Sequence, residues 1–284
     1  MKATTLPGAL GEPALELLHA APTGPVAPGS ARLLFVHGLG YAAWCWEDWM
    51  SAAAAAGHDS WAISLRGHGG SGGTAARAVL SDYEADVVRA ARSIPGPVVL
   101  IGHSMGGLVV QRAAVAAGAA AMILVAPLPP RPAVHTVLSV LRRQPWEVPR
   151  YLAGRPLRLG PHMLHAKPDA PGTAELGKRL TPDSPLVQYQ FLFHLPTRVP
   201  PLPALVLAAA EDRLVPFVSV RATAKRYEAD IREIEGVGHS MMLDAQWPEG
   251  WKQIESWLAD NREAAAGRSG PPPAVGGREM RGQE

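Results

Sequence analysis

The chain has 284 residues, of which 47% are hydrophobic, and its formal net charge is +2. This charge forms no concentrated basic patch of the kind that binds nucleic acid, and no apolar stretch reaches the roughly 20 residues that span a bilayer. With a single cysteine, Cys45, and no amino-terminal signal pattern, we expect a soluble cytoplasmic protein without an internal disulfide.

The first 30 residues are rich in Pro, Gly, Ala and Thr, and only residues 14–19 alternate well enough to predict a hairpin or edge strand. Apolar runs and helical patterns alternate along most of the remaining chain. Strands are predicted at 32–36, 60–65, 98–101, 121–125, 204–209 and 230–235, and those at 32–36 and 121–125 are predicted to be buried. Helices are predicted up to about 57, from Ser81 or Asp82 to about 94, and over 104–117, 217–227 and 248–258. This alternation predicts an α/β fold with a mostly parallel twisted sheet and helices on both faces.

The alternation breaks between residues 127 and 203, where prolines are frequent and helical fragments such as 133–143 are short. A structureless loop of this length is implausible in a compact domain, so we interpret it as a helical insertion that forms a lid. Residues 31–126 and 204–262 then make the core, and 1–30 form an amino-terminal segment with edge strands. The Pro- and Gly-rich tail, 263–284, is predicted to be disordered.

One stretch carries the clearest chemical signal: a β-branched run ends in Gly102-His103-Ser104-Met105-Gly106 and continues as a helix. A Gly-x-Ser-x-Gly sequence in the context of strand, turn and helix is typical of a nucleophilic serine held on a sharp turn. Gly102 and Gly106 are expected where a side chain would collide with a crossing segment. Ser104 is therefore the predicted nucleophile.

A serine hydroxyl needs a base to take its proton, and the base needs an acid to orient it. His239 follows the last predicted strand and Asp212 follows the strand at 204–209, so both lie at carboxyl ends of strands, where ligands bind in such sheets. We predict that His239 is the base and Asp212 the acid, with Glu211 as the nearest alternative acid. The simpler explanations are that His239 is an exposed loop histidine and that Asp212 caps the helix that follows it.

The reaction also needs two N–H donors for an oxyanion. The backbone N–H groups of Met105, after the nucleophile, and of Leu39, in the glycine loop after the strand at 32–36, are the candidates. His37 could be a second base, but we favour a role in shaping this loop by hydrogen bonding.

Five motifs together resemble the α/β-hydrolase superfamily, over about residues 31–126 and 204–259. They are His37-Gly38-Leu39-Gly40, Leu65-Arg66-Gly67-His68-Gly69, Gly102 to Gly107, Asp212-Arg213-Leu214-Val215-Pro216 and Gly238-His239. A shorter stretch, 43–46, is similar to a segment of plant methylesterase and hydroxynitrile-lyase relatives. The serine at the turn argues against epoxide hydrolases and dehalogenases, which use a carboxylate there. The resemblance implies this fold and acyl chemistry without a metal or other cofactor.

The insertion is the expected source of specificity. It carries ten basic and four acidic residues between 127 and 200, an excess of +6, which suggests either an anionic substrate or surface or simply a solvated helical face. Cys45 is interpreted as buried packing. The predicted substrate pocket includes His37, Trp44, Trp146, Met163 and Phe191.

The leading prediction is a serine hydrolase that acts on a small-molecule acyl substrate, a carboxylic ester or thioester, through an acyl-enzyme. Two alternatives remain. The same residues could serve an acyltransferase or a lyase, or the protein could be a non-catalytic binding protein with the same fold.

Overall fold

The computed structural model describes residues 1–26, 30–170, 173–194 and 202–265. Its centre is an eight-stranded sheet of order β1-β2-β4-β3-β5-β6-β7-β8, in which β1 and β2 are antiparallel to their neighbours and the other strands are parallel. The strands are β1 (Lys2–Leu6), β2 (Leu15–Ala20), β3 (Arg32–Val36), β4 (Ser60–Ile63), β5 (Val98–His103), β6 (Ala121–Val125), β7 (Ala204–Ala209) and β8 (Asp230–Ile234).

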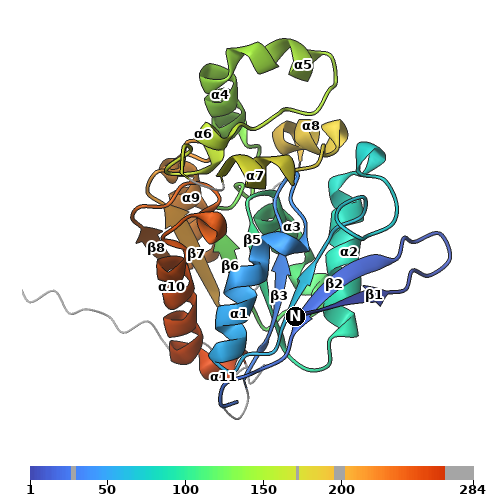
Figure 1. Ribbon diagram of the computed structural model, residues 1–284, viewed down its shortest axis with the longest axis vertical. Helices are drawn as coiled ribbons and strands as arrows, with labels where there is room; N and C mark the ends of the chain where they lie inside the picture. Colours follow the sequence, from blue (N-terminus) through green and yellow to red (C-terminus); the bar gives the residue numbers. More distant parts are fainter. Residues whose placement is uncertain (27–29, 171–172, 195–201, 266–284) are drawn as a thin grey trace, which may run out of the picture.

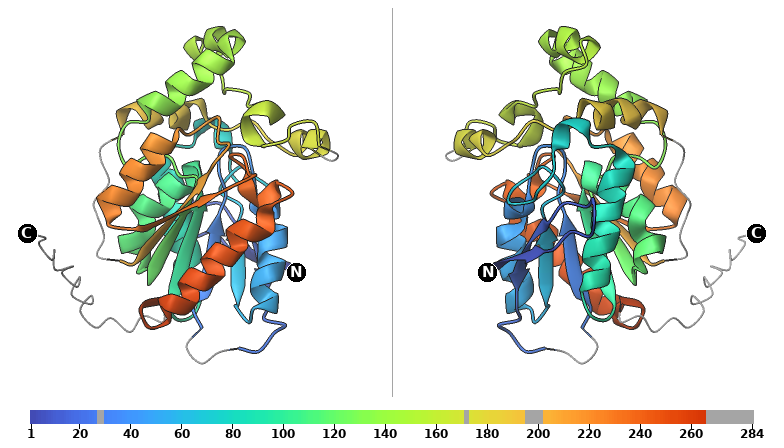
Figure 2. Two further views of the ribbon diagram at one scale, coloured as in Figure 1. Left: turned by 90° about the vertical axis from the view of Figure 1, so that its left-hand side faces the viewer. Right: turned by 90° about the vertical axis from the view of Figure 1, so that its right-hand side faces the viewer.

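Helices cover both faces of the sheet, as Figures 1 and 2 show. On one face lie α2 (Leu80–Ser93), α3 (Met105–Ala117) and α9 (Phe217–Tyr227); on the other lie α1 (Glu47–Ala55) and α10 (Trp247–Asp260). The central strands β5, β6 and β7 are buried along their whole length, which explains their continuous apolar runs. Short turns of helix complete the core: η1 (Ala43–Trp46), η2 (Ala75–Arg77), η4 (Met241–Leu243) and α11 (Arg262–Ala265).

The sheet and its covering helices confirm the predicted fold class, with a few local corrections. The strand predicted at 60–65 ends at Ile63, where its pairing with β3 also ends. Helix α2 begins at Leu80, so Asp82 lies in its first turn and accepts a hydrogen bond from the Val79 N–H (2.9 Å). Edge strands were predicted within residues 1–30, and a position was given only for the one at 14–19, which is β2; the other edge strand is β1. The predicted tail begins with helical residues 263–265, and the rest of it lies outside the described residues.

Between β6 and β7 the chain leaves the sheet and forms the predicted helical insertion, above the carboxyl ends of the strands (Figure 1). Its helices are α4 (Val134–Arg143), η3 (Pro145–Glu147), α5 (Val148–Leu152), α6 (Pro161–Leu164), α7 (Thr173–Lys178) and α8 (Pro185–Phe193). None of the helices in the described part of the chain is both long and apolar enough to cross a membrane.

The turn between β5 and α3 forces the backbone of Ser104 to φ 52° and ψ −116°, a region that non-glycine residues rarely adopt. A Cβ on Gly106 would lie 2.3 Å from the carbonyl oxygen of His37, and one on Gly102 would lie 2.4 Å from that of Gly106. Both contacts are with backbone and cannot be relieved by a side-chain rotation. The predicted need for glycine at these two positions is confirmed.

This crowding predicts that Gly106→Ala lowers the free energy of unfolding by about 2–3 kcal/mol, because β3 and α3 must separate to admit the methyl group. Urea denaturation followed by far-UV circular dichroism measures the change. Gly177→Ala is the matched control: its Cβ would meet nothing closer than Pro161 Cγ at 3.9 Å, and alanine suits helix α7. Equal stability of the two variants would contradict this account of the turn.

Candidate active site

Three side chains lie just after the carboxyl ends of β5, β7 and β8: Ser104, Asp212 and His239. Nδ1 of His239 lies 2.8 Å from Oδ2 of Asp212. A carboxylate can only accept, so Nδ1 carries the proton and Nε2 is left as the basic nitrogen. Nε2 is buried and has no hydrogen-bond partner among the described residues, and Ser104 and His239 line the same cavity. The structure thus brings the three predicted residues together.

The choice between the two neighbouring acids is also clear from the geometry. Oδ1 of Asp212 accepts hydrogen bonds from the N–H groups of Leu214 (2.7 Å) and Val215 (2.9 Å), so the carboxylate caps the turn before α9 and orients His239 at once. Glu211 instead accepts from the N–H of Gly236. Asp212, and not Glu211, therefore contacts the histidine.

His103, the residue before the nucleophile, holds the His239 loop in place. Its Nε2 donates to the carbonyl of His239 (2.9 Å), and the two rings lie 4.7 Å apart. Burial lowers the pKa of His103 well below its usual value, and nearby His239 lowers it further, so the ring stays neutral. Sequence reasoning missed this contact, because a histidine inside the motif gives no sign of which loop it reaches.

The glycine loop after β3 runs directly beside Ser104. A Cβ on Gly38 would lie 2.7 Å from the ring of His103 and 3.1 Å from Cβ of Ser104. His37 Nδ1 donates to the Gly38 carbonyl (2.8 Å), while its Nε2 accepts from the Leu65 N–H (3.0 Å). Burial lowers the pKa of His37 to about 3, which keeps it neutral as this pairing requires. These contacts favour the expected loop-shaping role over that of a second base.

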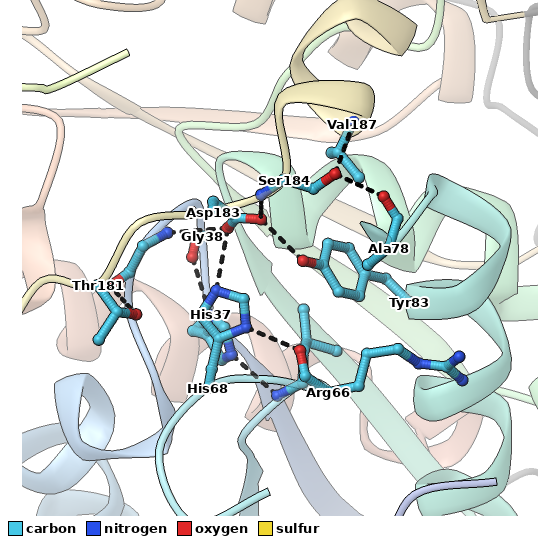
Figure 3. A network of polar contacts seen from close by, with 12 residues as sticks. His37, Gly38, Arg66, His68, Ala78, Tyr83, Thr181, Asp183, Ser184 and Val187 are labelled. Carbon is cyan, nitrogen blue, oxygen red and sulfur yellow. Dashed lines mark hydrogen bonds and ion pairs between the residues drawn. The ribbon is translucent and has the colours of Figure 1, made fainter. Parts of the chain in front are cut away.

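A carboxylate of the insertion, Asp183, reaches the other end of this loop (Figure 3). Its Oδ2 accepts from the N–H of Gly40 (3.0 Å) and lies 3.1 Å from Nε2 of His68, while its Oδ1 accepts from Tyr83 Oη (2.7 Å) and the Ser184 N–H (2.6 Å). Asp183 is 3% exposed and His68 is 1% exposed. We refer to Asp183, His68 and Tyr83 as the Asp183 cluster.

Both ring nitrogens of His68 face acceptors, Oδ2 of Asp183 and the carbonyl of Arg66 (3.1 Å). This suits the doubly protonated ring. Burial alone would lower the pKa of His68, but the hydrogen bond and the charge of Asp183 raise it above its usual value. Burial would raise the pKa of Asp183, but His68 and Tyr83 hold it below its usual value. The cluster is thus a buried ion pair.

A second histidine–aspartate pair joins the insertion to the core beside His239. His165 Nδ1 lies 2.8 Å from Oδ1 of Asp244, whose other oxygen accepts from the N–H groups of Gly238 (2.6 Å) and Ala166 (3.2 Å). The insertion is therefore attached near both loops that flank Ser104.

A cavity of about 590 Å³, its open mouth included, lies between Ser104 and the insertion. Most of its lining is aliphatic or aromatic, including Leu128, Val137, Val140, Leu164 and Phe191. Within the described residues, the lining includes no lysine or arginine. The excess positive charge of the insertion therefore lies outside this cavity, and the idea of an anionic partner stays a prediction.

Of the five side chains predicted for the pocket, only Phe191 lines the cavity. His37 is buried beneath the glycine loop, Met163 is packed in the core, and Trp146 is 60% exposed. Trp44 packs under the guanidinium of Arg179, 3.9 Å from the ring centroid. Cys45 is buried among apolar side chains, and this burial raises the pKa of its thiol well above the usual value, as a packing role predicts.

The model of the Alpha/beta hydrolase family matches residues 33–248, which is more than half of the sequence. The chain belongs to the alpha/beta hydrolase family. The match includes the glycine loop, Ser104, Asp212, His239 and the whole insertion.

Solved structures with the same fold include proteins named as an esterase and as a lipase. This alpha/beta hydrolase is similar to a thermophilic esterase from Thermogutta terrifontis, with TM-score 0.68 and 20% identity, over 92% of this chain and 99% of that one. It is also similar to a monoacylglycerol lipase from Paleococcus ferrophilus, with TM-score 0.61 and 20% identity, over 86% and 98%. At these identities the likeness shows the fold.

Two curated rice proteins named "Probable esterase PIR7A", from Oryza sativa subsp. indica and japonica, are each 40% identical over 83 residues. The matched stretch is 28% of this alpha/beta hydrolase and spans about a third (32%) of the length of each rice protein.

The Asp183 cluster predicts a defined pH dependence of stability. Because the pKa of His68 is raised in the folded state, its ion pair stabilises the fold below the ordinary histidine pKa, and the contribution is lost as pH rises through the raised value. Asp183 stays ionised there, since its pKa is lowered. The difference in free energy of unfolding between wild type and His68→Gln should therefore shrink from pH 6 to pH 9, as measured by urea denaturation. A difference that is constant or grows with pH would contradict the charged state of His68.

Proposed function

We propose that this protein is a serine hydrolase that cleaves carboxylic esters with an apolar acyl group through an acyl-enzyme. The observation that supports the proposal best is the pairing of His239 Nδ1 with Asp212, which leaves a buried, unpartnered Nε2 in the cavity that Ser104 lines. In uncomplexed enzymes the bond between nucleophile and base is often loose and forms only with substrate.

In the proposed reaction, Oγ of Ser104 attacks the carbonyl carbon while Nε2 of His239 takes the hydroxyl proton. The N–H groups of Leu39 and Met105 stabilise the oxyanion of the tetrahedral intermediate. The intermediate collapses to the acyl-enzyme, and the leaving alkoxide, or thiolate from a thioester, takes the proton from His239. Water then attacks the acyl-enzyme with His239 again as base, which releases the acid and regenerates Ser104.

The insertion would act as a lid in this reaction. Its helices α4 and α8 contribute Val137, Val140 and Phe191 to the cavity wall opposite the nucleophile. These side chains would hold the acyl chain and exclude bulk water from the acyl-enzyme. The apolar lining, free of basic side chains among the residues described, favours a neutral substrate.

A fluorophosphonate probe should label the wild-type protein and fail to label Ser104→Ala, as detected by intact-protein mass spectrometry. Asp212→Asn should lower kcat for a p-nitrophenyl ester by about 10⁴-fold, because the amide favours the wrong tautomer of His239. Glu211→Gln is the matched control and should stay within a few-fold of wild type. Labelling that persists in Ser104→Ala would refute the proposed nucleophile, and product analysis would reveal transfer or lyase chemistry.

The position of Val140 predicts a change in chain-length preference. Val140→Phe fills part of the cavity and should lower kcat/KM for p-nitrophenyl esters of ten or more carbons by about tenfold relative to the butyrate, since a lost hydrophobic contact or a clash costs about 1–3 kcal/mol. Leu138→Phe, on the same helix but at a position 49% exposed, should leave the preference unchanged. A uniform loss at all chain lengths in Val140→Phe would place the acyl group elsewhere.

A further inference from the structure

We propose that Asp183 is a positioning residue for the oxyanion hole: by holding Gly40 from the insertion, it fixes the loop that presents the N–H of Leu39 to the substrate. Docking of the insertion would then be a condition for catalysis as well as a cover for the site. The inference rests on the proposed function, because it assigns a role in the oxyanion hole of that same reaction.

The loop from His37 to Tyr41 is held at two points. At its first point the Gly38 carbonyl accepts from His37 Nδ1 (2.8 Å), and Nε2 of the same ring accepts from the N–H of Leu65 (3.0 Å), which belongs to the core. At its second point the Gly40 N–H donates to Oδ2 of Asp183 (3.0 Å), and the Gly40 carbonyl accepts from the Thr181 N–H (2.9 Å). Both partners of Gly40 belong to the insertion. Leu39 lies between the two points.

The conformation at Gly40 explains why a second point is needed. Gly40 has φ 76°, where glycine has no strong intrinsic preference, so the chain here needs contacts to fix it. Leu39 itself is only partly buried: its side chain packs against the core and lines the cavity, but this packing does not by itself fix the direction of its N–H. An N–H donor stabilises an oxyanion well only if it is already oriented before the reaction. The contacts to Gly40 supply that orientation.

Asp183 is well suited to hold a backbone N–H rigidly. Each oxygen of its carboxylate has two partners, and the partners come from separate elements: the glycine loop, the loop of His68, helix α2 and its own segment. The buried charge of His68 keeps the carboxylate ionised, and a charged acceptor makes a shorter and stronger hydrogen bond to an N–H. Figure 3 shows these bonds converging on Asp183 from opposite sides.

A purely structural role is the competing explanation, in which Asp183 only fastens the insertion to the core. The adjacent Ser184 makes the comparison possible. Its hydroxyl donates to the carbonyl of Ala78 (2.6 Å) and accepts from the N–H groups of Leu186 and Val187, so it caps α8 and fastens the same segment without touching Gly40. Loss of Ser184 Oγ should loosen the insertion and leave the oxyanion loop held.

The test compares Asp183→Ala and Asp183→Asn with Ser184→Ala in the full-length protein. Removing one member of a buried ion pair is strongly destabilising, so Asp183→Asn, which keeps an acceptor oxygen and the side-chain shape, provides a second variant that is expected to fold. Circular dichroism and thermal denaturation select the temperature at which every variant is folded.

The decisive measurement uses two related inhibitors. An alkyl trifluoromethyl ketone forms a tetrahedral adduct with the serine and needs the oxyanion hole, whereas the corresponding trifluoromethyl alcohol fills the same cavity and forms no adduct. In both Asp183 variants we expect the affinity for the ketone and kcat for a p-nitrophenyl ester to fall about 10- to 100-fold. This loss should not exceed the loss of kcat that follows removal of an oxyanion-hole donor. Affinity for the alcohol and KM should change less than about threefold. Ser184→Ala should stay within about threefold in all four quantities.

Equal losses for ketone and alcohol in the Asp183 variants, or losses in Ser184→Ala that match them, would show that Asp183 only fastens the insertion and would overturn the proposal. Unchanged ketone affinity in folded Asp183→Ala would overturn it as well. Failure of the proposed function looks different: wild type itself would then neither turn over the ester nor bind the ketone more tightly than the alcohol.

Discussion

The whole site depends on one steric constraint, the sharp turn between β5 and α3. Ser104 adopts a positive φ there, at a cost of about 1–3 kcal/mol, and the turn fits only because Gly102 and Gly106 carry no side chain against the crossing backbone. The glycine loop can approach Ser104 for the same reason: Gly38 has no side chain, and a Cβ there would collide with His103. Because β3 and β5 are neighbours at the point where the strand order reverses, nucleophile and glycine loop meet without further adjustment.

Three buried histidines around this turn show how the surroundings set a protonation state. His37 accepts at one nitrogen and donates at the other, and it is neutral; His103 donates to a carbonyl in a fully buried site, and it is neutral too. His68 faces two acceptors and is charged. Each ring ties a different pair of loops together. On His239, Nδ1 is paired with Asp212, and Nε2 lies buried without a hydrogen-bond partner among the described residues.

The sequence was sufficient to predict the fold and to place Ser104, Asp212 and His239 at one edge of the sheet, since each follows a parallel strand and parallel strands end at one edge. Asp212 was preferred over Glu211 from the sequence, because the pattern from Asp212 to Pro216 places the strand end and the helix start around it, and the structure pairs Asp212 with His239. The pocket could not be predicted from composition: Trp146 points to solvent and Met163 into the core, and the helices of the insertion carry no periodic pattern long enough to fix their faces. Asp183 was missed for a related reason, because its partners Gly40, His68 and Tyr83 lie 100 residues or more away in the chain.

In the two histidine–aspartate pairs that attach the insertion to the core, the histidine and the aspartate come from opposite sides of the contact. In one the core supplies His68 and the insertion supplies Asp183; in the other the insertion supplies His165 and the core supplies Asp244. A core without its insertion would therefore hold a histidine and a carboxylate that each lack the partner they have in the structure. The insertion is consequently not a module that can be exchanged among relatives by matching helices alone. A chimera would have to carry an acid and a histidine at these two places, or replace their partners in the core at the same time.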